Sequence, residues 1–123
     1  MSAFPEIVLE AFRAKHEVRI ETAAPTGEAH AVIIWIVVVG DVPYVRSVRG
    51  AKGRWFRELM AKGEGAIHVG PRRIPVRARR VTDTSESGRV SAAIQEKYTR
   101  PIPSVKAMIR DEVLATTASL EPA

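Results

Sequence analysis

The chain has 123 residues, a formal net charge of +5 and no cysteine. This length suits one domain with a single core, and the missing cysteines exclude disulfides, thiolate metal sites and cysteine nucleophiles. The longest apolar run, residues 31–39, is much shorter than the roughly 20 residues of a membrane span, and the N-terminal residues do not resemble a signal peptide. We therefore expect a single domain over residues 1–123 that is cytoplasmic and does not bind a membrane.

The positive charge is concentrated in one part of the chain. Residues 46–80 contain eleven Lys and Arg against two acidic residues, a charge of +9, and the remainder carries eight against twelve, or −4. Such an uneven distribution localises a positive field that attracts anionic ligands. A solvated basic surface would give the same pattern, so this observation leaves both interpretations open.

Three elements are expected before residue 40. Residues 4–14 place apolar side chains at helical spacing around Pro5 in the first turn, and residues 18–22 alternate like a strand that ends at a turn. Residues 29–39, AHAVIIWIVVV, then form an apolar, β-branched run. This run predicts one strand buried on both faces, inside a barrel or beneath a partner subunit.

The middle of the chain predicts a hairpin, a basic loop and a helix. Gly40-Asp41 is a two-residue hairpin signal, and residues 42–48 form the returning strand. After the loop, a helix begins near Gly53 and ends at Gly63, a good C-terminal cap. Two further strands, residues 66–69 and 73–81, then pair across a tight turn.

Several signals mark the last elements. Because Pro75 cannot donate a ladder hydrogen bond, its strand should lie at an edge or beside a bulge. Asp83, followed by Glu86, predicts a capping box for a helix through Tyr98. Ser104 should cap a last helix, and residues 114–122 read as a closing strand. Strands dominate the first two-thirds, so we predict a mainly β (α+β) fold, an antiparallel barrel or sheet with peripheral helices.

The sequence contains no self-sufficient catalytic motif. Its three histidines, His16, His30 and His68, lie far apart without metal-ligand spacing, so we expect structural roles and no metal site. We find no nucleophile elbow, no pair of catalytic carboxylates and no phosphate-binding loop of the nucleotide hydrolases.

Residues 44–55, YVRSVRGAKGRW, instead predict an anion site. Two glycines let backbone amides approach a ligand, and the following helix directs its free N–H groups at the loop. The arginines add forked, charge-assisted hydrogen bonds that suit a phosphate. The expected ligands are Arg46, Ser47, Arg49, Gly50, Lys52, Gly53 and Arg54. The alternative is a turn that needs two glycines and carries solvated arginines.

The two tryptophans have more than one interpretation. Trp55 belongs to the apolar stripe of the helix after the loop, which favours a core position. Trp35 lies in the apolar run, either in the core or at a dimer interface. Either ring could stack on a planar ligand, although we favour packing.

The order of these pieces resembles a known superfamily. The segment GRWFRELMAKGEGAIHVGPRRIPVRARRV combines a W-x-x-N/E-L helix with a strand pair that ends in V-x-A-x-x-V. It is similar to the flavin- and deazaflavin-binding split β-barrels, which include pyridoxamine-phosphate-oxidase-like proteins and deazaflavin-dependent nitroreductases. The segment VPYVRSVRGAKGRW most resembles a group within this superfamily that is known as a domain of unknown function. The resemblance covers residues 17–82 best.

This resemblance implies a homodimer of small antiparallel split β-barrels, with FMN or a deazaflavin coenzyme in a groove at the interface. The cationic loop would hold the cofactor phosphate, and Arg77 or Arg79 would assist from a neighbouring strand. Three functions are weighed, two from the resemblance and a third from the basic residues 46–80. The first is an oxidoreductase, nitroreductase-like, that acts on a small-molecule substrate, and the second is a non-catalytic barrel that binds a cofactor or phosphorylated metabolite. Nucleic-acid binding ranks third, because the aromatic residues are not interleaved with the cations on one surface.

Overall fold

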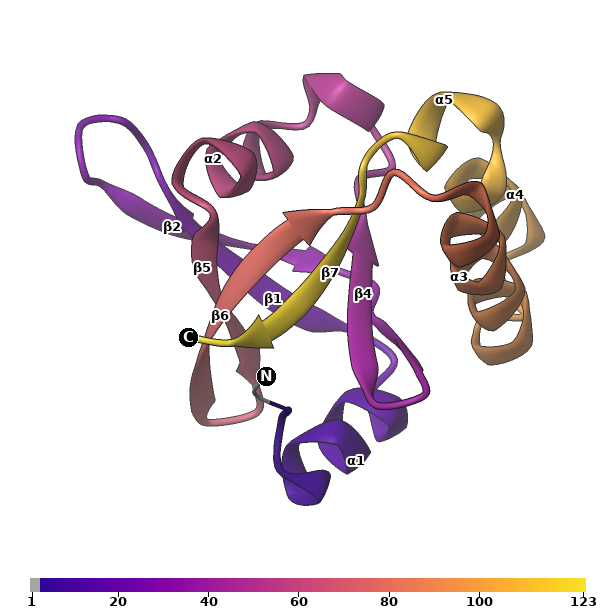
Figure 1. Cartoon of the computed structure of the whole chain (residues 1–123), viewed down its shortest axis with the longest axis horizontal. Coiled ribbons are helices and arrows are strands. Elements are labelled where there is room, and N and C mark those ends of the chain that lie inside the picture. Colours follow the sequence, from indigo (N-terminus) through magenta and orange to yellow (C-terminus); the bar gives the residue numbers. More distant parts are fainter. Residues whose placement is uncertain (1–2) are drawn as a thin grey trace.

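The computed structural model of the chain describes residues 3–123 (Figure 1). Within these residues, seven strands form one antiparallel sheet in the order β2-β1-β5-β6-β7-β4-β3. The strands are β1 Val18–Ala23, β2 Ala29–Ile34, β3 Val37–Val39, β4 Val42–Arg46, β5 Glu64–Val69, β6 Arg72–Arg80 and β7 Thr117–Pro122. The helices are α1 Glu6–Ala14, the 3₁₀ helix η1 Gly50–Lys52, α2 Arg54–Lys62, α3 Thr84–Lys97, α4 Ile102–Ile109 and α5 Asp111–Leu114.

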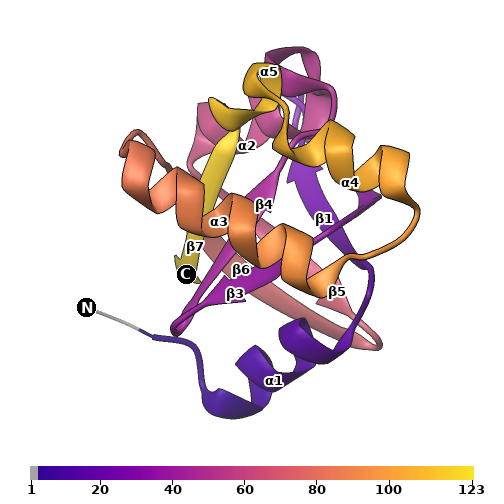
Figure 2. The same cartoon turned by 90° about the vertical axis from the view of Figure 1, so that its right-hand side faces the viewer.

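The sheet curls into a split β-barrel with helices at its periphery. Figure 1 shows α1 below the sheet, α2 above it, and α3 with α4 stacked beside β4, and the turned view in Figure 2 shows α3 and α4 running across the outside of that strand. This arrangement confirms the predicted mainly β (α+β) class. No helix in the described part of the chain is long and apolar enough to cross a membrane.

Side chains from both ends of the chain fill two apolar clusters. The curled sheet, α1 and α2 enclose the first, which includes Leu9, Phe12, Ile20, Leu59, Ile67 and Val76. The second lies between the β3–β4 hairpin and the helices α3 and α4, and it includes Val37, Tyr44, Val90, Ile94, Tyr98 and Met108. In this cluster Val90, Ile94 and Tyr98, spaced four residues apart, form the buried side of α3 and its C-terminal cap.

The apolar run at residues 29–39 departs from its prediction. It forms two strands, β2 and β3, at opposite edges of the sheet, with a break at Trp35 and Ile36. The break is fixed by Tyr98, whose hydroxyl accepts a hydrogen bond from the Ile36 N–H at 3.2 Å. Most of β2 is exposed, and Ile33 is 64% accessible. The expectation of one continuous strand buried inside the barrel is therefore wrong, because the chain crosses from one edge of the curled sheet to the other.

Turn and cap signals are confirmed at most positions. Gly40 closes the β3–β4 hairpin with a φ of +62°, and Gly63 ends α2 in the left-handed region. Both positions require a backbone conformation that glycine adopts without strain. Asp83 caps α3 by accepting a hydrogen bond from the Glu86 N–H at 2.8 Å.

The predictions for the strand that contains Pro75 and for the start of α4 are wrong. Pro75 lies in β6, an internal strand between β5 and β7, and not at an edge. Because the β6–β7 ladder begins only at Val76, the proline nitrogen faces the end of that ladder, where its missing N–H leaves no pair broken. Helix α4 begins at Ile102 rather than after Ser104, with Pro101 as its N-cap, because proline suits the first turn of a helix.

The surface cluster around Glu21 gives a pH-dependent stability. Hydrogen bonds from Arg73 and His68 lower the pKa of Glu21 to about 2. In the unfolded chain this carboxyl keeps its ordinary pKa, so Glu21 contributes its whole share of the free energy of unfolding above pH 5. As the pH falls to 2 this share is lost, and after solvent screening it amounts to about 1 kcal/mol. Urea unfolding at several pH values should show this loss in the wild type and a smaller loss in Glu21→Gln. Equal pH dependence in both proteins would contradict it.

Candidate functional site

Two hollows meet on the surface beside β2 and the loop after β4. The first, the Trp35 hollow, has a volume of about 380 Å³. The second, the loop hollow, has a volume of about 400 Å³. Ile33 and Val48 line both hollows, and these side chains are 64% and 46% exposed. The two hollows therefore adjoin across an exposed apolar ridge.

The floor of the Trp35 hollow is a stacked aromatic pair. The rings of Trp35 and Tyr98 are parallel to within 2°, with centroids 4.0 Å apart. Tyr98 is fully buried and does not line the hollow, so Trp35 alone of the pair lines it and Tyr98 supports the indole from within the protein. Its hydroxyl donates to the His16 carbonyl at 2.6 Å, and burial raises the pKa of Tyr98 to about 12. A flat, fixed aromatic surface of this kind suits a planar ring.

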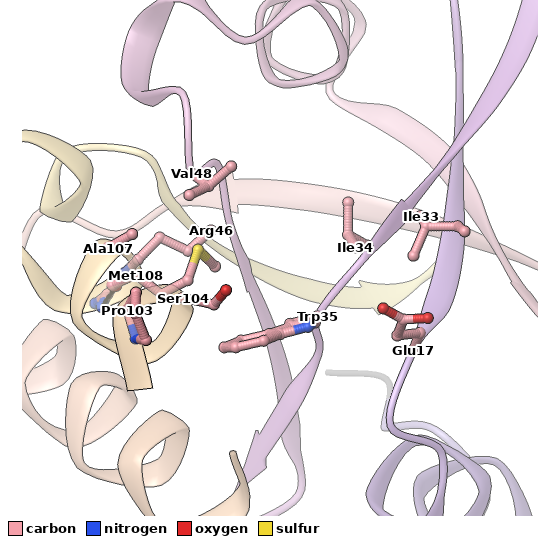
Figure 3. Close-up of a pocket in the computed structure, with 10 residues that line it drawn as sticks. All are labelled: Glu17, Ile33, Ile34, Trp35, Arg46, Val48, Pro103, Ser104, Ala107 and Met108. Carbon is pink, nitrogen blue, oxygen red and sulfur yellow. Dashed lines mark hydrogen bonds between the residues drawn. The ribbon is translucent and has the colours of Figure 1, made fainter. Parts of the chain in front are cut away.

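Figure 3 shows how polar groups surround this floor. The Glu17 carboxylate lies on the side of the indole nitrogen, and Pro103 and Ser104 of α4 lie on the other side. Arg46 approaches from β4, above the indole in this view. A ligand in this hollow would therefore meet an apolar face with charged or polar groups at its edges.

Arg46 is buried, although it is among the expected ligands of the anion site. Its side chain is 2% exposed and lies between β4, β7 and the helices α3 and α4. All its N–H groups donate to neutral oxygens, at distances of 2.8–3.2 Å: Thr117 Oγ1, Ser91 Oγ, the Met108 carbonyl, and the Ser87 carbonyl and Oγ. Burial lowers the pKa of Arg46 to about 10. Arg46 therefore offers positive charge to the Trp35 hollow but no free hydrogen-bond donor.

The loop hollow is built around the start of α2. Gly53 is the N-cap residue of this helix, and the first amides of an α-helix have no partner within the helix. Ser47 is 1% exposed, and among the described residues its hydroxyl has no hydrogen-bond partner. Ser47, Gly53 and Arg54 all line the hollow. A buried free hydroxyl beside helix amides and an arginine is a suitable environment for an anion.

The structure brings together only part of the predicted anion site. Ser47, Arg49, Gly53 and Arg54 line the loop hollow, whereas Lys52 lines neither hollow. Gly50 is buried in η1 with a φ of +66°, so it shapes the turn. Arg77 and Arg79 project from β6 outside both hollows, and Arg79 pairs with Glu86 at 2.9 Å.

Several lining residues lie outside the sequence prediction. They are Glu17, His30, Val32, Val48, Ser104 and Met108. His30 and Val32 alternate along β2, and this period of two could have indicated a strand with one face open. The continuous apolar residues that follow Val32 hide this period of two in the sequence.

Gly53 is predicted to tolerate no side chain while Ser47 is present. A Cβ at Gly53 would lie 2.3 Å from Ser47 Oγ. Gly53→Ala should therefore lower the free energy of unfolding by about 1–3 kcal/mol. The next contacts are at 3.3 and 3.4 Å, so Ser47→Ala should recover most of this loss in the double variant. Urea unfolding of the two single variants and the double variant checks the coupling, and additive losses would refute it.

The fold and the paired hollows define the class of this protein as a split β-barrel with a candidate ligand groove. A family model of uncharacterized proteins conserved in bacteria, DUF2255, matches residues 8–120. The chain belongs to this family. The match confirms the predicted resemblance to a group known as a domain of unknown function. No curated protein matches the sequence.

Solved structures share the fold at low identity. The heme storage protein HutZ from Vibrio cholerae is 17% identical, with a TM-score of 0.68 over 100% of this chain and 92% of that one. An F420-H2 dependent reductase is 15% identical, with a TM-score of 0.64 over 87% and 95%. A structure described as a domain-swapped dimer is 15% identical, with a TM-score of 0.63 over 87% and 81%. At these identities the likeness shows the split-barrel fold alone.

Proposed function

We propose that this protein binds a phosphate-bearing flavin-type cofactor, FMN or a deazaflavin coenzyme, and acts as an oxidoreductase on a small organic molecule. The observation that carries the proposal is the junction of the two hollows at Ile33 and Val48. One hollow has a stacked aromatic floor, and the other has cations, a free hydroxyl and the start of a helix. A cofactor with a planar ring at one end and a phosphate at the other matches both.

The chain's own residues would hold such a cofactor in distinct ways. Arg49 and Arg54 provide charge-assisted hydrogen bonds for the phosphate, and Ser47 together with the first amides of α2 complete that site. The Trp35 indole would pack against the ring. When bound, the cofactor supplies hydride transfer, so the protein needs position and electrostatics rather than its own acid–base pair.

The exposed ridge supports a homodimer that completes the groove. Val32, Ile33 and Val48 are 37%, 64% and 46% exposed, and they lie at the rim of the hollows. Contiguous exposed apolar side chains often mark interaction surfaces. A second copy placed over this rim would bury them and narrow the mouth of the groove.

A charge at the ridge should separate the subunits. Ile33→Glu would place a carboxylate in the apolar interface, so we expect a monomer where the wild type is a dimer, measured by light scattering. Ile7→Glu is the matched control, because Ile7 is 62% exposed on α1 and lines neither hollow. A dimeric Ile33→Glu protein would place the interface elsewhere.

The cofactor can be tested directly. Purified protein is titrated with FMN, FAD and the deazaflavin coenzyme, at low and moderate salt, and followed by thermal shift and fluorescence. Saturable stabilisation by one of them at moderate salt is the expected result, because binding to the native state alone raises its stability. Stabilisation that disappears at moderate salt would indicate only non-specific attraction to the basic surface. No stabilisation by any of them would refute the proposal.

A non-catalytic carrier is the second candidate. It is favoured by HutZ, which shares the fold and is described as a heme storage protein. The two candidates differ after binding: an oxidoreductase passes electrons from a reductant to an organic acceptor repeatedly, whereas a carrier binds the cofactor without turnover. Single-turnover reduction followed by addition of a nitroaromatic or quinone acceptor separates them.

A further inference from the structure

A nearly buried carboxylate joins three elements behind the loop hollow. The Glu58 side chain on α2 is 9% exposed. Its Oε1 accepts hydrogen bonds from Thr22 Oγ1 of β1, at 2.7 Å, and from His30 Nε2 of β2. Its Oε2 accepts a hydrogen bond from Arg54 Nε at 3.1 Å. Glu58 itself does not line the loop hollow, so none of the binding roles described above uses it.

Two of its partners do line that hollow. The Arg54 side chain is 61% exposed, and an unrestrained arginine at this exposure would sample many rotamers. The bond from Nε to Glu58 restrains it and leaves the two terminal nitrogens of the guanidinium for a ligand. His30 is restrained in the same way through Nε2. The carboxylate thus orders Arg54, a potential anion ligand on α2, together with the neighbouring His30 ring on β2 before any ligand arrives.

The ionisation of Glu58 is consistent with this role. Burial by itself raises the pKa of this carboxyl, but the hydrogen bonds from its three partners outweigh burial and leave the pKa below its ordinary value. Glu58 therefore stays ionised at neutral pH and keeps its acceptors available. An ionised carboxylate held in this way is a common support for groups that contact a ligand.

We infer that Glu58 is a positioning residue for a phosphate in the loop hollow, because it fixes Arg54 and His30 without touching the ligand. The inference rests on the proposed function of this hollow as a phosphate site. It adds a residue to that site whose charge has the wrong sign for direct contact with the ligand.

The negative charge of Glu58 allows positioning to be distinguished from simple electrostatic attraction. Removing a carboxylate beside an anion site raises the local positive charge, so simple electrostatic attraction predicts tighter phosphate binding. Loss of positioning predicts weaker binding, since Arg54 and His30 would have to be ordered when the ligand binds. The two effects oppose each other, and the direction of the change identifies the larger.

The test compares Glu58→Gln with Glu64→Gln. Glu64 is an exposed acid at the start of β5 that lines neither hollow of the site, so its replacement makes the same charge change. Methyl phosphate is the probe, and its affinity is measured by NMR titration of the folded proteins. We expect Glu58→Gln to bind about tenfold more weakly than wild type. Glu64→Gln should bind as well as wild type or slightly better.

Each other outcome overturns the inference. If folded Glu58→Gln binds methyl phosphate as tightly as wild type or more tightly, Glu58 does not position the site, and the proposed function still stands. If wild type itself does not bind methyl phosphate, both the inference and the phosphate site fail.

Should Glu58→Gln not fold, Glu58→Asp provides the same test with the charge kept. Its shorter side chain withdraws the carboxylate from Arg54 Nε, so about tenfold weaker binding is again expected. Unchanged affinity in Glu58→Asp would overturn the inference.

Discussion

Arg46→Ala is expected to lower the free energy of unfolding by about 3 kcal/mol or more, measured by urea denaturation. The substitution leaves a cavity where a fully buried side chain had been. It also leaves buried oxygens of Ser87, Met108 and Thr117 without the hydrogen bonds that they accept from the guanidinium in the wild type. These oxygens belong to α3, α4 and β7, so the variant loosens the helices from the barrel.

Two further variants test this explanation. Arg49→Ala removes an equal charge from an exposed side chain, and its stability should change by less than about 0.5 kcal/mol. Arg46→Met fills part of the volume and removes a buried charge that has no acidic partner, so it should cost less than Arg46→Ala. If Arg46→Ala kept its stability and lost only cofactor affinity, Arg46 would be a ligand rather than a structural tie.

Replacing both Arg49 and Arg54 with Ala should weaken cofactor binding by about 100-fold, because two charge-assisted hydrogen bonds to the phosphate are lost. Both side chains line the loop hollow and are exposed, so the fold should remain intact. Fluorescence titration with the cofactor that stabilises the wild type measures the effect. The salt dependence of binding should also become less steep in the double variant.

Lys52→Ala is the matched control for this experiment. Lys52 belongs to the same basic loop but lines neither hollow. Its replacement should change affinity by no more than about twofold, the effect of one distant, screened charge. If Lys52→Ala weakened binding as much as the double variant, the general field of the loop would govern binding instead of the contacts in the hollow.

The wider fold does not decide among these outcomes. Proteins described as a heme storage protein and as an F420-H2 dependent reductase share this split barrel at 17% and 15% identity. A fold that hosts such different ligands establishes no activity by itself. The experiments therefore address residues of the two hollows rather than the architecture.

Local signals in the sequence determined the elements of this protein. Gly40 and Gly63 require positive φ, and Asp83 precedes Glu86 at capping distance, so the hairpin, the end of α2 and the start of α3 could be predicted. The basic loop followed by a helix also brings Ser47 and Arg54 to one hollow, and their role as phosphate ligands stays a prediction. Each of these features depends on residues within a few positions of one another.

Only the tertiary structure decided which of these residues meet. Arg46 is buried because its partners stand 41 to 71 positions further along the chain. The apolar run divides between two edges because β7, from the C-terminal end, inserts between β6 and β4. Glu58 reaches His30 only because α2 packs over β1, the strand that pairs with β2. Composition and periodicity report the environment that each residue needs, but not which distant residue will supply it.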